Sequence, residues 1–168
     1  MSALIVGSLA DAVKPWASLY ADSKGVATAV TFVHLAGLLA AGGFALASDR
    51  ATLRTFEAPE ADRMRQLEEL HAIHRPVLLG LTVTMLSGLL LFAADLKTFL
   101  PSPFFWTKMG LIALLLLNGY LMTRAERALR GGPADPVFWW KRLRVTALAS
   151  FALWFAVLLA GTMLANLA

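Results

Sequence analysis

Four long apolar runs restrict what this chain can fold into. Each is close to the roughly 20 residues that an α-helix needs to cross a hydrocarbon core about 30 Å thick. Charged side chains are nearly absent from these runs: Arg75 lies at the very start of the second, and Lys108 is the exception within a span. We therefore predict an all-α integral membrane four-helix bundle, with spans at about Val26–Ser48, His74–Ala94, Phe104–Thr123 and Val145–Leu167.

The composition favours the same class of protein. Of the 168 residues, 58% are hydrophobic and only 15% are charged, whereas a soluble domain has about 45–50% apolar and about 25% charged residues. Because a chain of this size cannot bury so much apolar surface in a core of its own, we expect most of it to contact membrane lipid. The absence of cysteine excludes disulfides and thiolate metal sites.

The lysines and arginines are distributed unevenly between the two sides of the predicted membrane. Five lie in the loop after the first span, six lie in the loop after the third, and the remaining four are elsewhere. Loops rich in Lys and Arg stay in the cytoplasm. We therefore predict a bacterial inner (cytoplasmic) membrane protein with both termini in the periplasm. The basic residues flank apolar spans, so the net charge of +4 does not indicate a nucleic-acid partner.

This topology predicts the result of reporter fusions. Fusions at Ala58 and Ala134 should give a cytoplasmic signal, and a fusion after Ala168 should give a periplasmic one. A cytoplasmic signal at the C-terminus would contradict the assignment.

The residues before the first span have a different pattern. Apolar side chains recur there at helical spacing, with polar residues between them, which is typical of an amphipathic helix that lies at a membrane interface. We predict such a helix within residues 1–25, on the outer surface and bent at Pro15, followed by a transmembrane domain over residues 26–168. The alternative is a poorly ordered tail. The apolar positions are Ile5, Leu9, Val13, Trp16 and Tyr20.

Small residues line one face of several spans. In lipid, helices associate through such residues and a few polar ones, because apolar side chains gain little by leaving the lipid tails. These faces should therefore meet at the centre of the bundle, and they place His34 inside it. The faces are His34, Gly37, Ala41 and Ala45 in span one, Gly80, Thr84, Ser87 and Gly88 in span two, and Ser150, Trp154 and Gly161 in span four.

Three polar side chains should converge in the outer half of the bundle. Helix rise places Lys108 about 6 Å and His34 about 12 Å below the outer boundary, with Ser87 at a similar level. Inserting an ionisable side chain at membrane depth costs about 2.5–3.5 kcal/mol of free energy, so such a residue is a candidate for a functional site. Two alternatives stay open: Lys108 could extend outward toward Asp95, and His34 could be a neutral side chain bonded to a carbonyl or to Ser87.

The other two histidines precede the second span. Glu68, His71 and His74 are spaced three residues apart, so on a helix they share a face that suits a metal ion. The sequence does not point to a second helix that would supply matching ligands. The alternative is a hydrated turn at the membrane interface.

Four short motifs follow one another within residues 28–125. They are a histidine early in span one, a proline at the start of span two, a Ser-Gly pair within it and an aromatic-x-x-Lys sequence that opens span three. The runs are Val33–His34–Leu35–Ala36–Gly37, His74–Arg75–Pro76–Val77, Leu86–Ser87–Gly88–Leu89–Leu90 and Phe105–Trp106–Thr107–Lys108. This order resembles a group of small bacterial membrane proteins: the copper-resistance D-type proteins, the haem-associated J-type protoporphyrinogen oxidases and uncharacterised four-helix relatives.

The resemblance carries expectations about function. In the oxidase branch, the span-one histidine and the span-three lysine are tied to haem b and to activity, which implies these roles for His34 and Lys108. The chain departs from that branch late in span three, where Asn118–Gly119–Tyr120 stands in place of a second histidine. It is therefore most similar to the uncharacterised members, and whether it is an enzyme stays open.

Our leading hypothesis is a polytopic inner-membrane protein with a site in the outer half of the bundle. His34, Lys108 and Ser87 would bind haem b or copper there, with His34 as the metal ligand, in redox or metal homeostasis. The alternative is a non-catalytic accessory subunit of a larger respiratory or photosynthetic membrane complex, in which His34 is purely structural. The expected partners are lipid and either a second copy of the chain or such a complex.

Overall fold

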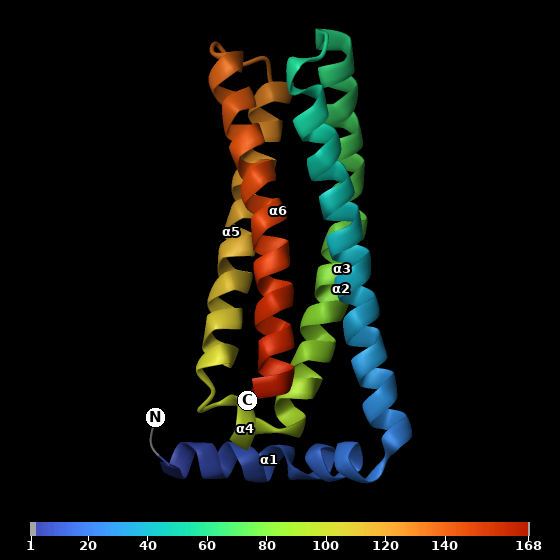
Figure 1. The fold of residues 1–168 in the computed structure, drawn as a ribbon, viewed down its shortest axis with the longest axis vertical. Helices are drawn as coiled ribbons and strands as arrows, with labels where there is room; N and C mark the ends of the chain where they lie inside the picture. Colours follow the sequence, from blue (N-terminus) through green and yellow to red (C-terminus); the bar gives the residue numbers. More distant parts are fainter. Residues whose placement is uncertain (1–2, 168) are drawn as a thin grey trace.

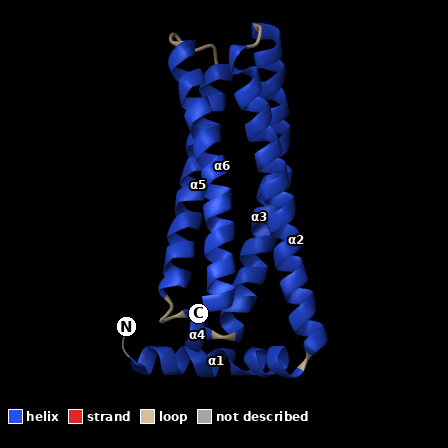
Figure 2. Ribbon diagram, in the orientation of Figure 1, coloured by secondary structure: helices blue, strands red, loops and turns tan. Residues whose placement is uncertain are grey.

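A computed structural model describes residues 3–167, and every regular element within that range is helical (Figure 2). The predicted all-α class is therefore confirmed. The four long helices are α2 (Lys24–Arg54), α3 (Glu60–Ala94), α5 (Pro103–Arg130) and α6 (Pro136–Leu167). The shorter elements are α1 (Ala3–Asp22), the 3₁₀ turn η1 (Thr55–Glu57) and α4 (Leu96–Phe99).

The four long helices are long and apolar enough to cross a membrane. The protein is thus a polytopic membrane protein whose outer surface contacts lipid. The helices extend beyond the predicted spans because their ends are polar but still helical. For example, α3 begins directly after Pro59, carries Glu60 and Asp62 in its first turn, and continues without interruption through Pro76. Acidic residues in a first turn interact favourably with the positive end of the helix dipole.

The long helices run side by side, and α1 lies across one end of the bundle (Figure 1). We call this end the α1 end. The opposite end, where residues 55–59 and 131–135 connect the helices, is called the arginine-rich end. The closest pairings are α2 with α3 and α5 with α6, and these two hairpins meet mainly through α2 and α6.

Helix α1 is attached to the bundle by polar contacts. The Trp16 indole Nε1 donates a hydrogen bond of 2.8 Å to the Leu90 carbonyl in α3. The Tyr20 hydroxyl lies 3.4 Å from the Thr31 hydroxyl in α2. The predicted N-terminal helix is present, and it runs through Pro15 as one helix. Its placement at the membrane interface stays a prediction, as does the boundary at residue 25.

The small-residue faces of α2 and α3 are in direct contact, as the sequence predicts. A Cβ atom on Gly37 would lie 2.7 Å from Thr84 Oγ1 and 3.1 Å from the Gly80 carbonyl oxygen. A Cβ on Gly80 would lie 2.9 Å from the backbone nitrogen of Ala41. Because these neighbours are largely backbone atoms, the two helices could not keep this distance with larger residues at either glycine.

A second packed region lies at the arginine-rich end, where α3, α5 and α6 meet. Its buried side chains surround the polar residues described below and hold α3 against α5. They are Leu67, Leu70, Met122, Ala125, Leu129, Trp140, Leu143 and Ala147.

Candidate metal centre

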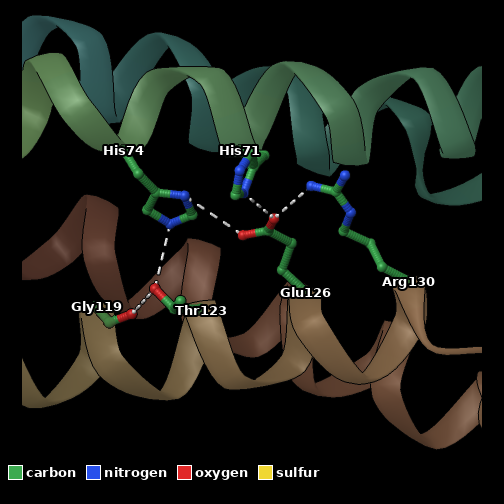
Figure 3. A network of polar contacts seen from close by, with 6 residues as sticks. All are labelled: His71, His74, Gly119, Thr123, Glu126 and Arg130. Carbon is green, nitrogen blue, oxygen red and sulfur yellow. Dashed lines mark hydrogen bonds and ion pairs between the residues drawn. The ribbon is translucent and has the colours of Figure 1, made fainter.

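Two histidines of α3 face a glutamate of α5 at the arginine-rich end (Figure 3). His71 Nδ1 lies 3.3 Å from Glu126 Oε1. His74 Nδ1 lies 3.5 Å from Glu126 Oε2. One potential ligand atom from each of the three residues lies within 4.8 Å of the other two. We call this group the His-His-Glu group.

The surrounding helices explain this arrangement. His71 and His74 are three residues apart, so they project from the same side of α3. Leu67 and Leu70 precede them on α3 and pack in the same core as Ala125, which is next to Glu126. This apolar packing fixes the distance between the two helices. It also leaves Glu126 only 1% exposed.

Glu126 is a buried carboxylate with one oxygen that accepts no hydrogen bond. Arg130, one turn further along α5, donates a hydrogen bond of 3.5 Å from Nη1 to Oε1. Oε2 accepts no hydrogen bond, although His74 Nδ1 is only 3.5 Å away. A buried charge is costly unless it is paired, hydrogen-bonded or coordinated to a metal. A cation between Oε2 and the imidazole would remove this deficit.

The Thr123 hydroxyl lies beside His74 on the side away from Glu126. Its single proton can go to the Gly119 carbonyl, 2.9 Å away, or to His74 Nε2, 3.2 Å away. When the proton goes to the shorter Gly119 bond, Nε2 carries a hydrogen and the neutral ring has its lone pair on Nδ1, facing a carboxylate oxygen. In that arrangement a cation, either a proton or a metal ion, would sit between the two lone pairs.

The geometry suits a tetrahedral metal ion. With metal–ligand bonds of about 2.1 Å, ligand atoms in a tetrahedral site are about 3.4 Å apart. The two N–O distances, 3.3 and 3.5 Å, are close to this spacing, but they end on different oxygens of Glu126. The three ligand atoms lie within 4.8 Å of one another, so small side-chain rotations would bring them to a single ion. His71 is 67% exposed, which provides a route for the ion and room for a water ligand. The Thr123 contact would orient His74, as hydrogen bonds to metal-bound histidines commonly do.

The structure brings His34 and Ser87 together at the α2–α3 interface. Ser87 donates a hydrogen bond of 2.6 Å to the Val83 carbonyl, so it can only accept from His34 Nδ1, 3.2 Å away. His34 Nδ1 also lies 3.0 Å from the Thr84 carbonyl, to which it donates. The inward placement of His34 is confirmed. These bonds leave its lone pair on Nε2.

Lys108 points into the bundle toward α6. Its Nζ would lie 3.6 Å from a Cβ atom on Gly161, and it is close enough to His34 for an electrostatic interaction. The Lys108 side chain is therefore placed between helices at the level of Gly161. The proposed roles of His34, Lys108 and Ser87 in cofactor binding stay predictions.

Sequence reasoning missed Glu126 as the partner of the two histidines. Glu68, which was expected to share their face, is exposed and is not part of the group. One signal was available: Glu126 is an acidic residue among Arg124, Arg127 and Arg130 at the end of an apolar span. That run was interpreted only as a topology signal.

Comparison with known proteins does not assign the chain to a family. No family model matches it, and no curated protein or solved structure matches it either. The resemblance to copper-resistance and haem-associated membrane proteins therefore stays a prediction.

Proposed function

We propose that this membrane protein binds a divalent transition metal, zinc above all, at the His-His-Glu group and serves metal homeostasis. The observation that supports this most strongly is the position of His74 Nδ1, which lies 3.5 Å from the unbonded Oε2 of buried Glu126. The predicted topology places the site on the cytoplasmic side of the membrane.

The ligand types favour zinc over other common ions. Imidazole nitrogen and carboxylate oxygen bind Zn²⁺ well, whereas Cu⁺ prefers thiolate or thioether sulfur, and Mg²⁺ and Ca²⁺ prefer oxygen ligands alone. Two histidines and one glutamate supply three ligands, which leaves the fourth tetrahedral position for water or for a transferred ligand. A site of this kind can exchange its metal more readily than a closed site with four protein ligands.

A proton is the competing occupant. An imidazolium at His74 would pair with Glu126, and together with Arg130 this would form an ion-pair network without any metal. Metal and proton compete for the same lone pairs. Measured metal content therefore distinguishes the two states of the site.

A second candidate function is haem b or copper binding at His34. The specific observation in its favour is the tautomer: Nδ1 donates to the Thr84 carbonyl, which orients the ring and leaves Nε2 able to bind a metal. The ammonium of Lys108 would pair with a haem propionate or another anion, and this would offset the cost of its charge in the membrane.

Variants at the three histidines separate these proposals. We would purify the wild type and the His71→Ala, His74→Ala and His34→Ala variants from cells supplied with haem, zinc and copper. Metal content and the visible spectrum would then be measured. We expect about one zinc per chain in the wild type and in His34→Ala, as for a single mononuclear site, and a large loss of zinc in both other variants.

Each other outcome has a defined meaning. A Soret band that disappears only in His34→Ala would favour the second candidate. Zinc retained by both His71→Ala and His74→Ala would contradict the first. A colourless, metal-free wild type would contradict both and favour the accessory-subunit alternative. Equal melting temperatures of the variants in chelator would show that lost zinc does not reflect unfolding.

A further inference from the structure

A cavity of about 100 Å³ lies inside the bundle, between the His-His-Glu group and the centre of the membrane-spanning helices. All four long helices contribute to its wall, which is mostly apolar. A single water molecule needs only about 10–15 Å³ of such space, so the cavity can hold an ion with several waters. The polar side chains in its wall are Ser48, Asp49, His74 and Ser150.

Asp49 is a buried acidic side chain that the proposed metal site does not use. It is 2% exposed, and its neighbour Ser48 is 3% exposed. Among the described residues, Asp49 Oδ2 and Ser48 Oγ have no hydrogen-bond partner, and the carboxylate accepts a hydrogen bond from the Ser150 hydroxyl. No basic side chain within residues 3–167 forms an ion pair with Asp49. Buried oxygens in this state are costly unless a proton, a water or a cation satisfies them.

We propose that this cavity binds a monovalent cation the size of Na⁺, with the Asp49 carboxylate as its charged ligand. The Ser48 and Ser150 hydroxyls would be neutral ligands, and water would complete the coordination. His74 forms part of the wall of this cavity and also belongs to the His-His-Glu group. The proposed sodium ligands are different residues, so the proposal does not depend on the proposed function.

The chemistry of the wall selects the type of cation. The ring nitrogens of His74 face Glu126 and Thr123, so the polar atoms left to face the cavity are the oxygens of Ser48, Asp49 and Ser150. Met122 adds one thioether sulfur, which is a weak ligand. Oxygen ligands bind hard cations rather than transition metals. One carboxylate balances one positive charge, whereas calcium sites generally use several carboxylates. A monovalent ion therefore leaves the buried site neutral.

The competing state is a protonated Asp49 that bonds only to Ser150. In that state, replacing Asp49 with asparagine would change little, and sodium would have no specific effect. The two states therefore differ in how sodium affects stability.

The test is the melting temperature of the purified full-length protein in detergent as NaCl replaces choline chloride at constant ionic strength. A zinc chelator is present throughout. Because stabilisation by a ligand grows as ln(1 + [L]/Kd), the melting temperature should be about 3–6 °C higher at a sodium concentration tenfold above the dissociation constant, and should continue to rise with the logarithm of the concentration. Asp49→Asn should abolish the rise. Ser150→Ala should keep it and shift the sodium concentration at which it begins about tenfold higher, because one neutral ligand is lost.

His71→Ala serves as the control, because it removes the metal ligand and should leave the sodium response unchanged. Three results would overturn the proposal: no sodium response in the wild type, an unchanged response in Asp49→Asn, or a rise that begins at a lower concentration of Mg²⁺ or Ca²⁺ than of Na⁺. If Asp49→Asn does not fold, an unchanged sodium concentration for the start of the rise in both Ser48→Ala and Ser150→Ala would equally overturn it.

Discussion

Glu126→Gln is expected to lower the affinity of the protein for zinc at least about 100-fold. Removing a residue that merely orients a metal ligand typically costs 10–100-fold in affinity, and Glu126 is proposed as a direct ligand and the only anionic one. The neutral amide keeps the shape of the side chain but binds zinc weakly. Competition between the protein and a zinc-sensitive dye would give the dissociation constants.

Glu68→Gln is the matched control, since Glu68 lies one turn from His71 on α3 and is exposed. It should leave the zinc affinity unchanged. The melting temperature distinguishes a ligand from an ion-pair partner. If Glu126→Gln destabilises the protein equally with zinc and with chelator, Glu126 serves only to pair with Arg130 and the histidines.

Gly37→Leu should lower the free energy of unfolding by about 3 kcal/mol or more, at the upper end of the range for overpacked cores. The Cβ atom of the leucine side chain would already lie 2.7 Å from Thr84 Oγ1 and 3.1 Å from the Gly80 carbonyl oxygen in α3. Helices α2 and α3 would have to separate, and the His34 contacts with Thr84 and Ser87 would be lost. We expect the melting temperature in detergent to fall by about 6–12 °C.

Gly43→Leu provides the comparison on the same helix. Gly43 has open space where a side chain would extend, so the change should cost little. Similar losses of stability in the two variants would indicate a general effect of replacing glycine in α2, and would argue against the close approach of α2 and α3.

Hydropathy and residue size were enough to predict most of the fold. Uninterrupted apolar runs require helices in lipid, because backbone groups cannot stay unpaired there. The stripe of Gly37 and Ala41 on one helix and Gly80 on the next then determines how α2 and α3 face each other. His34 is on the same face of α2 as Gly37 and Ala41. Its inward placement could therefore be predicted correctly from the periodicity within a single helix.

The His-His-Glu group was not predictable in the same way. His71 and His74 show their spacing in the sequence, but Glu126 reaches them only because α3 and α5 pack together across two different hairpins. Periodicity within one helix carries no information about which face of another helix lies opposite. Asp49 is a similar case: it follows an apolar span and looks like a loop residue, yet α2 continues past it and buries it.

Zinc X-ray absorption of the purified protein would test the central claim most directly, because it reports the identity and distance of the atoms around the metal. The account predicts tetrahedral zinc with nitrogen and oxygen ligands at about 2.0–2.2 Å, with scattering from two imidazole rings that falls to one ring for the zinc that His71→Ala still binds. Six-coordinate zinc without imidazole scattering, or a spectrum that His71→Ala and Glu126→Gln leave unchanged, would contradict it.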